Sequence, residues 1–530
     1  MKGLVAAGHP ETAAAAAAVL AEGGNAVDGA LAGLCAACVA EPVLASLGGG
    51  GFLVARPADG PAAGRPVVYD FFVQTPKRRR REDEADFRNV AADFGPARQS
   101  FHVGLGAIAT PGVVAGVFAA ASDLARLPVR RLVEPAVALA RAGVRVNATH
   151  AYIIEVVRAI IDADPSMRRL FQSVEHPDRL LTEGEIQRQP ELADALEILA
   201  IEGPDLFYRG EMGRLLVADC TERGGHLWAD DLAAYAVERR APLSLDVFGA
   251  RLLINPPPAM GGLLVAYALA VWQQLGPLAG GFGSASHVGR LLTTLRASAA
   301  VRRRAEKMPP EELADALLAP SALARACAEI RGRPAGGERT TQISVVDADG
   351  GAASLTLSNG EGSAYVLPGT GIILNNMLGE VDLNPDGAAG WACDRRMTSM
   401  MAPALVLQPD GTITALGSGG SMRIRSAMLQ TIVNLLVLKM PLVEAVTVPR
   451  LHLEMNDPPD ENDGAAAETL SVEPGFMPDV IGSAFGDAGR VDYWPARNMF
   501  FGGVHATRRS ATGGFEGGAD DRRGGAVQIA

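Results

Sequence analysis

The stretch Gly336–Gly362 reads GGERTTQISVVDADGGAASLTLSNGEG, and the fold prediction starts from it. Two runs that alternate apolar and polar residues flank Asp349-Gly350, which is the pattern of a β-hairpin. The lead-in, RGRPAGGER at residues 331–339, has the composition of a mobile or cleavable loop. We therefore predict a buried hairpin whose first strand, at Thr340 and Thr341, begins as though it were the N-terminus of a chain.

A threonine at a chain terminus can act as a nucleophile without a histidine. Its hydroxyl attacks an amide carbonyl while its own α-amine accepts the proton. The pKa of an α-amine is about 7.7–8.0, far below the value of about 10.4 for lysine, so much of it is free to accept a proton near neutral pH. An internal threonine lacks this amine, so the chain must first break after Arg339 to expose it on Thr340.

The composition excludes several classes of protein. The chain has 530 residues, of which 48% are hydrophobic and 20% charged, so it can bury a sizeable core. A net charge of −12 disfavours nucleic-acid binding, and an aromatic content of 5% offers few platforms for base stacking. The first residues, MKGLVAAGHPETAAAAAAVL, resemble a mature helix rather than a signal peptide, and no run is long enough to span a membrane. We predict a cytoplasmic protein.

The common catalytic and metal-binding motifs are absent from the sequence. It contains no G-x-S-x-G elbow, no H-E-x-x-H and no Walker A loop, and its eight histidines are scattered. Cys35 and Cys38 form a lone C-x-x-C within an apolar run, which predicts two free thiols on a buried helix rather than half of a zinc site. We predict no metal and no cofactor.

The pattern along the chain changes near residue 340. Residues 10–35 predict two alanine-rich helices broken at Gly23-Gly24, and residues 125–330 are mostly of helical periodicity. Residues 106–120 predict a strand, a Pro-Gly turn and a helix. Beyond residue 340 the pattern is rich in strands, with one amphipathic helix in RSAMLQTIVNLLVLKM. One mixed sheet is expected to draw on both parts.

Several blocks, taken in order, resemble the gamma-glutamyltranspeptidase family of N-terminal nucleophile hydrolases. They include HPETAAAAAAVLAEGGNAVDGALAG, EPVLASLGGGGFLV, NPPPAMGG, TTQISVVDADG, GTGIILNN, GSGGSMRI and VPRLHLE, and they span nearly the whole chain. The resemblance implies an α+β fold, the αββα sandwich of that superfamily. It also implies a precursor that cuts itself into a helix-rich large subunit, residues 1–339, and a strand-rich small subunit, residues 340–530. Both are expected to contribute to one intertwined domain.

The resemblance assigns catalytic roles to four residues. Thr340 matches the nucleophile, and Thr341 matches the second threonine of the motif, which supports the site. Gly419 and Gly420 match the glycine pair that supplies the oxyanion hole. Two successive backbone N–H groups without side chains can face a developing oxyanion, and each such donor is worth about 10²–10³ in rate.

Four further residues are expected around the nucleophile on the same grounds. Ser358 is also expected to be catalytic, because it or its neighbour Asn359 falls where the family has a hydroxyl and an amide near the nucleophile. Glu380 falls where the family has a carboxylate that grips the α-amine of the substrate, and Ser399 matches one of two serines that bind the substrate carboxylate.

Three positions depart from the family pattern of substrate recognition. Phe72 stands where the family has an arginine that pairs with the α-carboxylate, Met377 replaces a glutamine, and Met400 replaces the second serine. A phenylalanine supplies neither the charge nor the paired donors of arginine. A carboxylate would not be left unpaired in such a pocket, so either the acyl group differs or another cation takes over. The candidate cations are Arg396, Arg423 and Arg425.

Together these patterns predict a self-processing N-terminal-threonine amidohydrolase or acyltransferase. It would cleave gamma-glutamyl-type or related small amides through an acyl-enzyme, with a small-molecule amide as its partner and neither nucleic acid nor membrane. Two alternatives stay open. One is a hydrolase of a different amide, oxamate-like or cephalosporin acylase-like, and the other is an unprocessed pseudoenzyme that binds a metabolite.

Overall fold

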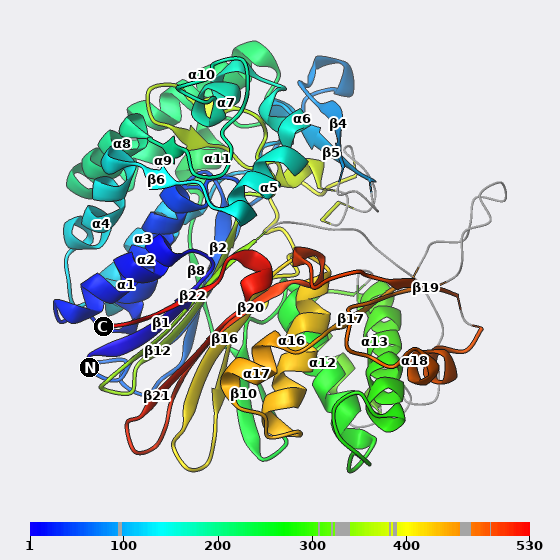
Figure 1. Ribbon diagram of the computed structural model, residues 1–530. Helices are drawn as coiled ribbons and strands as arrows, with labels where there is room; N and C mark the ends of the chain where they lie inside the picture. Colours follow the sequence, from blue (N-terminus) through cyan, green and yellow to red (C-terminus); the bar gives the residue numbers. More distant parts are fainter. Residues whose placement is uncertain are drawn as a thin grey trace.

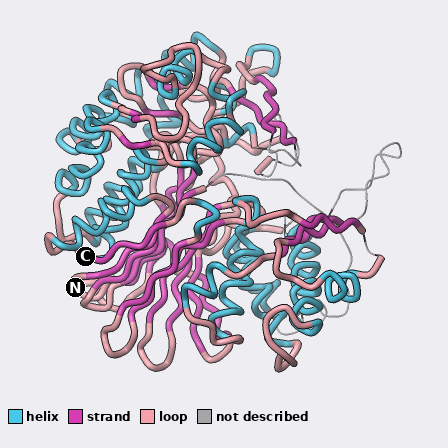
Figure 2. Tube along the Cα trace, in the orientation of Figure 1, coloured by secondary structure: helices cyan, strands magenta, loops and turns pink. Residues whose placement is uncertain are grey.

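The computed structural model describes residues 1–93, 98–305, 308–319, 322–323, 340–380, 383–384, 390–455, 468–487 and 489–530. In this part of the chain two β-sheets lie face to face, and helices cover the outer face of each sheet (Figure 1). The strands form a central block flanked by helices on both sides (Figure 2). This is the predicted αββα sandwich of the α+β class.

The first sheet joins strands from both sides of residue 340. Its pairs are antiparallel, and in the described residues its order is β22 (Ala526–Ile529), β1 (Gly3–Ala7), β11 (Thr341–Asp347), β12 (Ala352–Ser358), β2 (Gly50–Arg56), β3 (Val67–Phe71) and β8 (Glu238–Arg240). The predicted hairpin is β11–β12, with the turn at Asp349-Gly350.

The second sheet is also antiparallel and faces the first. Its order in the described residues is β21 (Phe515–Ala519), β20 (Gly503–Arg509), β16 (Ile413–Gly419), β15 (Ala404–Leu407), β10 (Ala250–Ile254) and β9 (Leu243–Val247). Its central strand, β16, lies against β11 and β12 of the first sheet.

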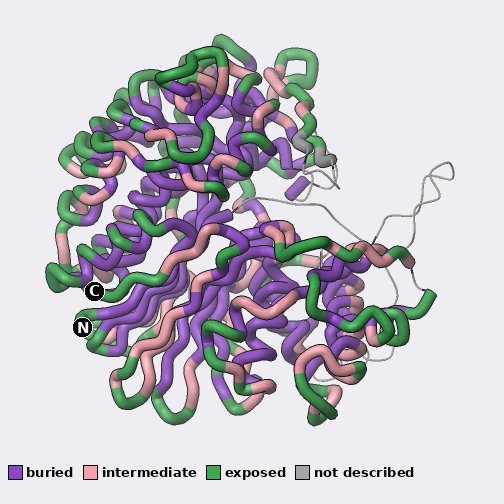
Figure 3. The backbone as a smooth tube through the Cα atoms, viewed as in Figure 1, coloured by how far each residue is buried: buried purple, intermediate pink, exposed green. Residues whose placement is uncertain are grey.

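Each sheet has its own helical layer. Beside the first sheet lie α1 (Pro10–Ala21), α2 (Ala26–Ala40), α3 (Val113–Leu124), α4 (Val129–Ala142) and α8 (Pro190–Glu202). Beside the second sheet lie α12 (Met260–Gln274), α13 (Ala285–Ala305), α16 (Arg423–Leu436) and α17 (Leu442–Thr447). The inner strands of each sheet are largely buried, whereas the edge strands β22, β8 and β9 are partly exposed (Figure 3).

Shorter elements complete the described part of the chain. The helices are α5 (Ala148–Val156), α6 (Arg158–Ile161), α7 (Pro165–Phe171), α9 (Asp205–Tyr208), α10 (Glu211–Arg223), α11 (Ala229–Ala234), α14 (Pro310–Leu318) and α18 (Pro478–Phe485). The small sheets are β4 (Arg88–Asp93) with β5 (Arg98–Val103), β6 (Val144–Arg145) with β7 (Ile186–Gln187), β13 (Val366–Leu367) with β14 (Ile372–Ile373), and β17 (Leu451–Met455), β18 (Glu468–Val472) and β19 (Arg490–Tyr493).

The two alanine-rich helices form where the sequence predicts them. Asn25 caps α2 in a capping box with Asp28, because its side chain accepts N–H bonds of the first turn while the Asp28 carboxylate accepts the Asn25 N–H. A Cβ placed at Gly33 would lie 3.2 Å from Ile343, so α2 packs closely on β11. Cys35 and Cys38 are free and buried on α2, as predicted.

Two parts of the prediction for the first sheet are incomplete or wrong. The terminal strands β1 and β22 were not predicted, because each is short and lacks a turn signal that would set it apart. The strand expected at the start of residues 106–120 is instead a 3₁₀ turn, Leu105–Ala107, followed by a single bridge from Thr110 to Gln74.

The interface between the sheets is apolar at one end and polar at the other. Leu4, Val54 and Leu405 belong to the apolar cluster. Toward the start of β11, the Gln342 amide donates to Ser354 Oγ at 3.0 Å, and Ser344 Oγ donates to the His505 carbonyl of the second sheet at 2.9 Å. The polar end is the end at which Thr340 precedes β11.

A short turn near the C-terminus, η5 (Asp521–Arg523), is held by buried ion pairs. Arg522 Nε donates to Glu473 Oε1 at 2.7 Å, and Arg522 Nη1 lies 3.0 Å from Asp520 Oδ1. Arg450 Nη2 lies 2.7 Å from Asp520 Oδ2. These side chains are almost completely removed from solvent, so their geometry fixes the turn that carries Arg523.

We expect Glu473→Ala to lower the free energy of unfolding by about 3–5 kcal/mol, because it leaves the Arg522 guanidinium buried without its main partner. Urea unfolding followed by circular dichroism measures the change. Glu197→Ala serves as the control, because it removes an ion pair with Arg141 that is about half exposed and should cost at most about 1 kcal/mol. Equal losses in the two variants would contradict the role given to the buried pairs.

Candidate active site

Thr340 is the residue at which the described chain resumes before β11. It is 1% exposed, and its hydroxyl has no hydrogen-bond partner among the described residues. Side chains alternate along a strand, so Thr340 shares the face of Gln342 and Ser344, which is turned toward the second sheet. Buried hydroxyls are nearly always paired, so the Thr340 hydroxyl offers a hydrogen-bonding position that a ligand could occupy.

Gly419, the last residue of β16, lies directly against Thr340, and Gly420 follows it. A Cβ at Gly419 would lie 2.1 Å from the Thr340 carbonyl oxygen, so no other residue fits there without a shift of the backbone. Gly420 has φ of +123° and Ser421 has φ of +55°, so the chain bends sharply past the end of the strand. A positive φ in a buried non-glycine residue is the kind of backbone strain found at functional sites.

Ser358 and Asn359 lie beside Thr340 at the end of β12. Thr341 pairs with Leu357, so the same register places Thr340 opposite Ser358, and opposed side chains share a face. The Gly360 N–H donates to Ser358 Oγ at 3.0 Å. Asn359 is completely buried, and neither atom of its side-chain amide has a hydrogen-bond partner in the described part of the chain. It is therefore a second buried polar group that a ligand could satisfy.

Glu380 reaches the same turn from a different segment. A Cβ at Gly360 would lie 2.7 Å from Glu380 Oε1 and 2.0 Å from the Asn376 side-chain oxygen, so the three residues are in close contact. Asn376 also accepts the Glu361 N–H at 3.0 Å. Glu380 is 2% exposed. The carboxylate thus lies against Gly360, the residue that follows Asn359.

Thr341 faces the opposite side of the first sheet, where a buried carboxyl group holds it. Thr341 Oγ1 donates to Glu41 Oε2 at 2.6 Å, and Thr12 Oγ1 donates to Glu41 Oε1 at 2.8 Å. Burial raises the pKa of Glu41 to about 7, and the two hydroxyl donors and the Arg523 charge limit the rise. Sequence reasoning missed Glu41, although a lone carboxylate that follows an apolar helix was a visible signal.

Arg523 was also missed, and it contacts the candidate nucleophile directly. Its Nη1 donates to the Thr340 carbonyl at 3.4 Å, and its Nη2 donates to the Met499 carbonyl at 3.3 Å. A Cβ at Gly419 or Gly420 would lie 3.2 or 3.3 Å from the same guanidinium. No local signal marks this arginine, because only the folded chain brings η5 beside β11.

The residues at the predicted recognition positions are buried side chains of the core. Phe72 is completely buried and stacks on Phe52, with ring centroids 5.5 Å apart, and Met377 belongs to the same apolar cluster. Met400 packs in a neighbouring cluster. Ser399 is buried, and its hydroxyl accepts the N–H of Met401 at 3.1 Å.

Three arginines are candidate replacements for the family arginine that pairs with the substrate carboxylate, and each of them contacts other groups of the protein. Arg396 donates to the carbonyl of Phe72 and to the Tyr235 hydroxyl, the latter at 2.6 Å, and its Nε lies 3.6 Å from Asp70. Arg423 Nη2 lies 2.8 Å from Glu454. Arg425 is buried, with Nη2 3.5 Å from the Leu453 carbonyl. Arg396 and Arg423 therefore serve as partners of carboxylates of the protein itself.

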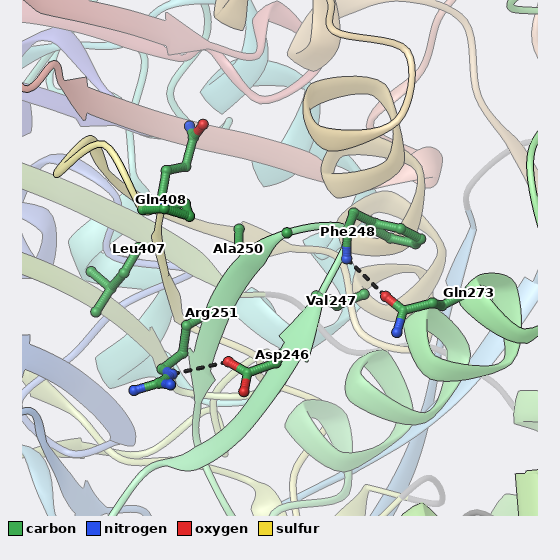
Figure 4. A pocket seen from close by; sticks show the side chains of 10 residues that line it. Asp246, Val247, Phe248, Ala250, Arg251, Gln273, Leu407 and Gln408 are labelled. Atoms are coloured by element: carbon green, nitrogen blue, oxygen red, sulfur yellow. Dashed lines mark hydrogen bonds and ion pairs between the residues drawn. The ribbon is translucent and has the colours of Figure 1, made fainter.

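A surface pocket of about 500 Å³ lies away from these residues, beside the β9–β10 turn (Figure 4). There Asp246 and Arg251 form an ion pair at 3.0 Å, and the Phe248 N–H donates to Gln273 Oε1 at 2.8 Å. The pocket touches the end of β15, near the start of β16, whereas Gly419 ends β16. A seven-residue strand is about 20 Å long, so this pocket is separate from the Thr340 site.

The sequence of this chain is similar to proteins of one known family. A family model described as Gamma-glutamyltranspeptidase matches residues 12–530. The chain belongs to this family. It is 33% identical over 475 residues to the acylase ACY 1 proenzyme of Pseudomonas sp. strain SE83, which covers 86% of this chain and 83% of that protein. It is 30% identical over 492 residues to the glutathione hydrolase proenzyme of Escherichia coli strain K12, which covers 87% of this chain and 81% of that protein.

A solved structure confirms the fold. The cephalosporin acylase from Bacillus halodurans superposes with a TM-score of 0.82, covering 100% of this chain and 96% of its own, at 22% sequence identity. The predictions of the family, of the αββα fold and of an enzyme of this class are confirmed. None of the helices in the described ranges is both long and apolar enough to cross a bilayer.

The buried carboxyl of Glu41 predicts a pH-dependent stability. Its pKa is about 7 in the folded protein and 4.5 when unperturbed, so folding takes up a proton between these values and the free energy of unfolding falls as pH rises through them. Glu41→Gln removes the contribution of this carboxyl to the pH dependence of the free energy of unfolding. We expect the difference in unfolding free energy, wild type minus variant, to fall by roughly 2–3 kcal/mol from pH 5 to pH 8 in urea titrations. A difference that stays constant over this range would contradict the burial of a titrating carboxyl.

Proposed function

We propose that this protein is a self-processing amide hydrolase or acyltransferase in which Thr340 becomes an N-terminal nucleophile. The observation that carries the proposal is the buried hydroxyl of Thr340, which has no partner in the described residues, on a residue whose main-chain carbonyl packs against Gly419. Leaving a hydroxyl buried and unpaired costs free energy, which binding of a substrate group can recover. The family membership and the proenzyme names of two relatives support the same proposal.

The first step is hydrolysis of the peptide bond between residues 339 and 340. It consumes one water and leaves a carboxylate on Arg339, which lies outside the described residues, and an α-amine on Thr340. The products are the segments 1–339 and 340–530, which correspond to the large and small subunits.

The mature site then has both groups that acyl transfer requires. The α-amine of Thr340 takes the proton of its own hydroxyl, and Oγ1 attacks the amide carbonyl of the substrate. The oxyanion that forms faces the N–H groups of Gly419 and Gly420. The ammonium then protonates the leaving amine, and an acyl ester remains on Thr340. Water or a second amine resolves this ester, which distinguishes hydrolysis from transfer.

We expect Thr340→Ala to stay as one band of 55.1 kDa on a denaturing gel, whereas the wild type splits into two bands and mass spectrometry places the new N-terminus at residue 340. The variant should also have no amidase activity, since it lacks the hydroxyl. Thr221→Ala, at an exposed threonine, is the control and should split normally. Two bands in Thr340→Ala would contradict the role of Thr340, and an unsplit wild type that binds metabolites would favour the pseudoenzyme.

The acyl group of the substrate is proposed to be less polar than gamma-glutamyl. Met377, Met400 and Phe72 are buried apolar side chains where the family pattern has polar partners. Arg396 and Arg423 are paired with protein carboxylates, so neither offers an open position for a substrate carboxylate. A relative named as an acylase, at 33% identity, fits this proposal, and gamma-glutamyl amides remain the second candidate because a relative at 30% identity is named glutathione hydrolase.

We expect the wild type to turn over a butyryl anilide better than a gamma-glutamyl anilide. The double variant Met377→Gln with Met400→Ser should shift the ratio of kcat/KM values by about tenfold or more toward gamma-glutamyl, because polar partners discriminate strongly. Met477→Gln, at a methionine that is 64% exposed, is the matched control. Efficient, saturable turnover of the gamma-glutamyl anilide by the wild type would overturn this substrate assignment.

A further inference from the structure

One buried carboxyl group has no part in the reaction proposed above, yet it lies one residue away from the nucleophile. Glu41 is 1% exposed, and its two oxygens accept the hydroxyls of Thr341 and Thr12 at 2.6 and 2.8 Å. Thr341 follows Thr340 directly, so a single hydrogen bond and a single peptide unit connect the carboxyl to the nucleophile.

The space around this hydrogen bond is filled. A Cβ at Gly8 would lie 2.6 Å from Glu41 Oε2 and 2.8 Å from Thr341 Oγ1, so the backbone of Gly8 closes over the pair. The charged and titratable groups of the described residues whose fields couple to Glu41 are Arg523 from η5 and the Cys38 thiol on α2. Arg523 also donates to the Thr340 carbonyl at 3.4 Å. The Glu41 carboxyl thus holds Thr341, and the Arg523 guanidinium holds the preceding residue, Thr340.

The charge of Glu41 is not needed to end α2. The Glu41 N–H bonds to the Ala37 carbonyl at 2.7 Å, a main-chain contact that any residue except proline would make. Burying a carboxyl is costly, and a neutral or apolar side chain would fill the same space at lower cost. Titratable groups held in unfavourable surroundings cluster at functional sites.

We propose that Glu41 is a positioning residue for the nucleophile. Its ionised carboxyl holds the Thr341 hydroxyl from one side of the sheet and, together with Arg523, keeps the Thr340 backbone against Gly419 and Gly420 on the other side. The inference rests on the proposed function of Thr340. It adds that the acyl-transfer geometry depends on a carboxylate that never touches the substrate.

The first test compares variants at Thr341 in the processed enzyme. Thr341→Val removes the hydroxyl at nearly constant volume, and we expect kcat to fall about 10- to 100-fold with KM changed less than about twofold, as for loss of a hydrogen bond to a charged group. Thr341→Ser keeps the hydroxyl and should recover kcat to within about threefold. Thr12→Val removes the donor to the other oxygen and should cost clearly less than Thr341→Val. Equal losses in Thr12→Val and Thr341→Val would assign the effect to packing and overturn the proposal.

The second test uses the pH profile of kcat. In the wild type both Glu41, with a pKa of about 7, and the Thr340 α-amine take up protons on the acid side. As the pH is lowered below 7, both protonations reduce kcat. Over part of this range log kcat should therefore fall by more than one unit for each unit that the pH falls. In Glu41→Gln it should fall by at most one unit per pH unit. An identical profile and an unchanged kcat in Glu41→Gln would overturn the proposal.

The two proposals fail in different ways. If the wild type does not split before Thr340, the proposed function fails, and the positioning role that rests on it fails with it. If the wild type splits and turns over amides while Glu41→Gln and Thr341→Val behave as it does, only the positioning role fails. If Glu41→Gln does not fold, the comparison of Thr341→Val with Thr341→Ser still decides the matter.

Discussion

The geometry of the candidate site depends on the close approach of two backbones, one at the start of β11 and one at the end of β16. A Cβ at Gly419 would lie 2.1 Å from the Thr340 carbonyl oxygen, and one at Gly417 would lie 2.1 Å from the Gln342 side-chain oxygen. Glycine at alternate positions of β16 therefore lets a polar strand of the first sheet rest directly on the second. Facing sheets usually lie about 10 Å apart with side chains filling the space between them, and here the side chains on one side are missing.

The charged and the apolar side chains considered for the site belong to two separate groups. Behind the strand that carries Thr340, Glu41 and Arg523 form a buried charged support, and Arg523 is itself fixed by the ion pairs of Arg522. Where the family pattern has polar partners for the substrate, this chain has the buried side chains of Phe72, Met377 and Met400. In the proposed reaction the charged groups would position Thr340, and the acyl group of the substrate would be selected by shape and apolar contact.

The sequence predicted what depends on local pattern and failed where distant segments meet. The hairpin at residue 341, the helix starting after Asn25 and the amphipathic helix α16 each carry a periodicity or a capping signal. The short terminal strands carry none, and only pairing across the whole chain makes β1 and β22 part of the sheet. The convergence of Thr340 with Gly419 followed from ordered family motifs rather than from either residue alone.

The residues missed at the site share a physical reason. Arg523 and Glu41 contact the Thr340 strand from segments 183 and 300 residues away along the chain, respectively. Nothing in the local sequence of either residue records that contact. Phe72 shows the converse case, because its departure from the family motif was visible, but its stacking on Phe52 in the core required the structure.

The order of strands has a mechanical consequence for a chain that is cut. In the first sheet β1 lies between β22 and β11, and β12 lies between β11 and β2, so strands that precede residue 340 interleave with strands that follow it. In the second sheet the two parts meet at one junction, where β10 from before residue 340 pairs with β15 from after it. A cut before residue 340 consequently leaves two polypeptides that are held together by the main-chain hydrogen bonds between their β-strands. They could part only by extracting an inner strand, which would dismantle the sheet itself.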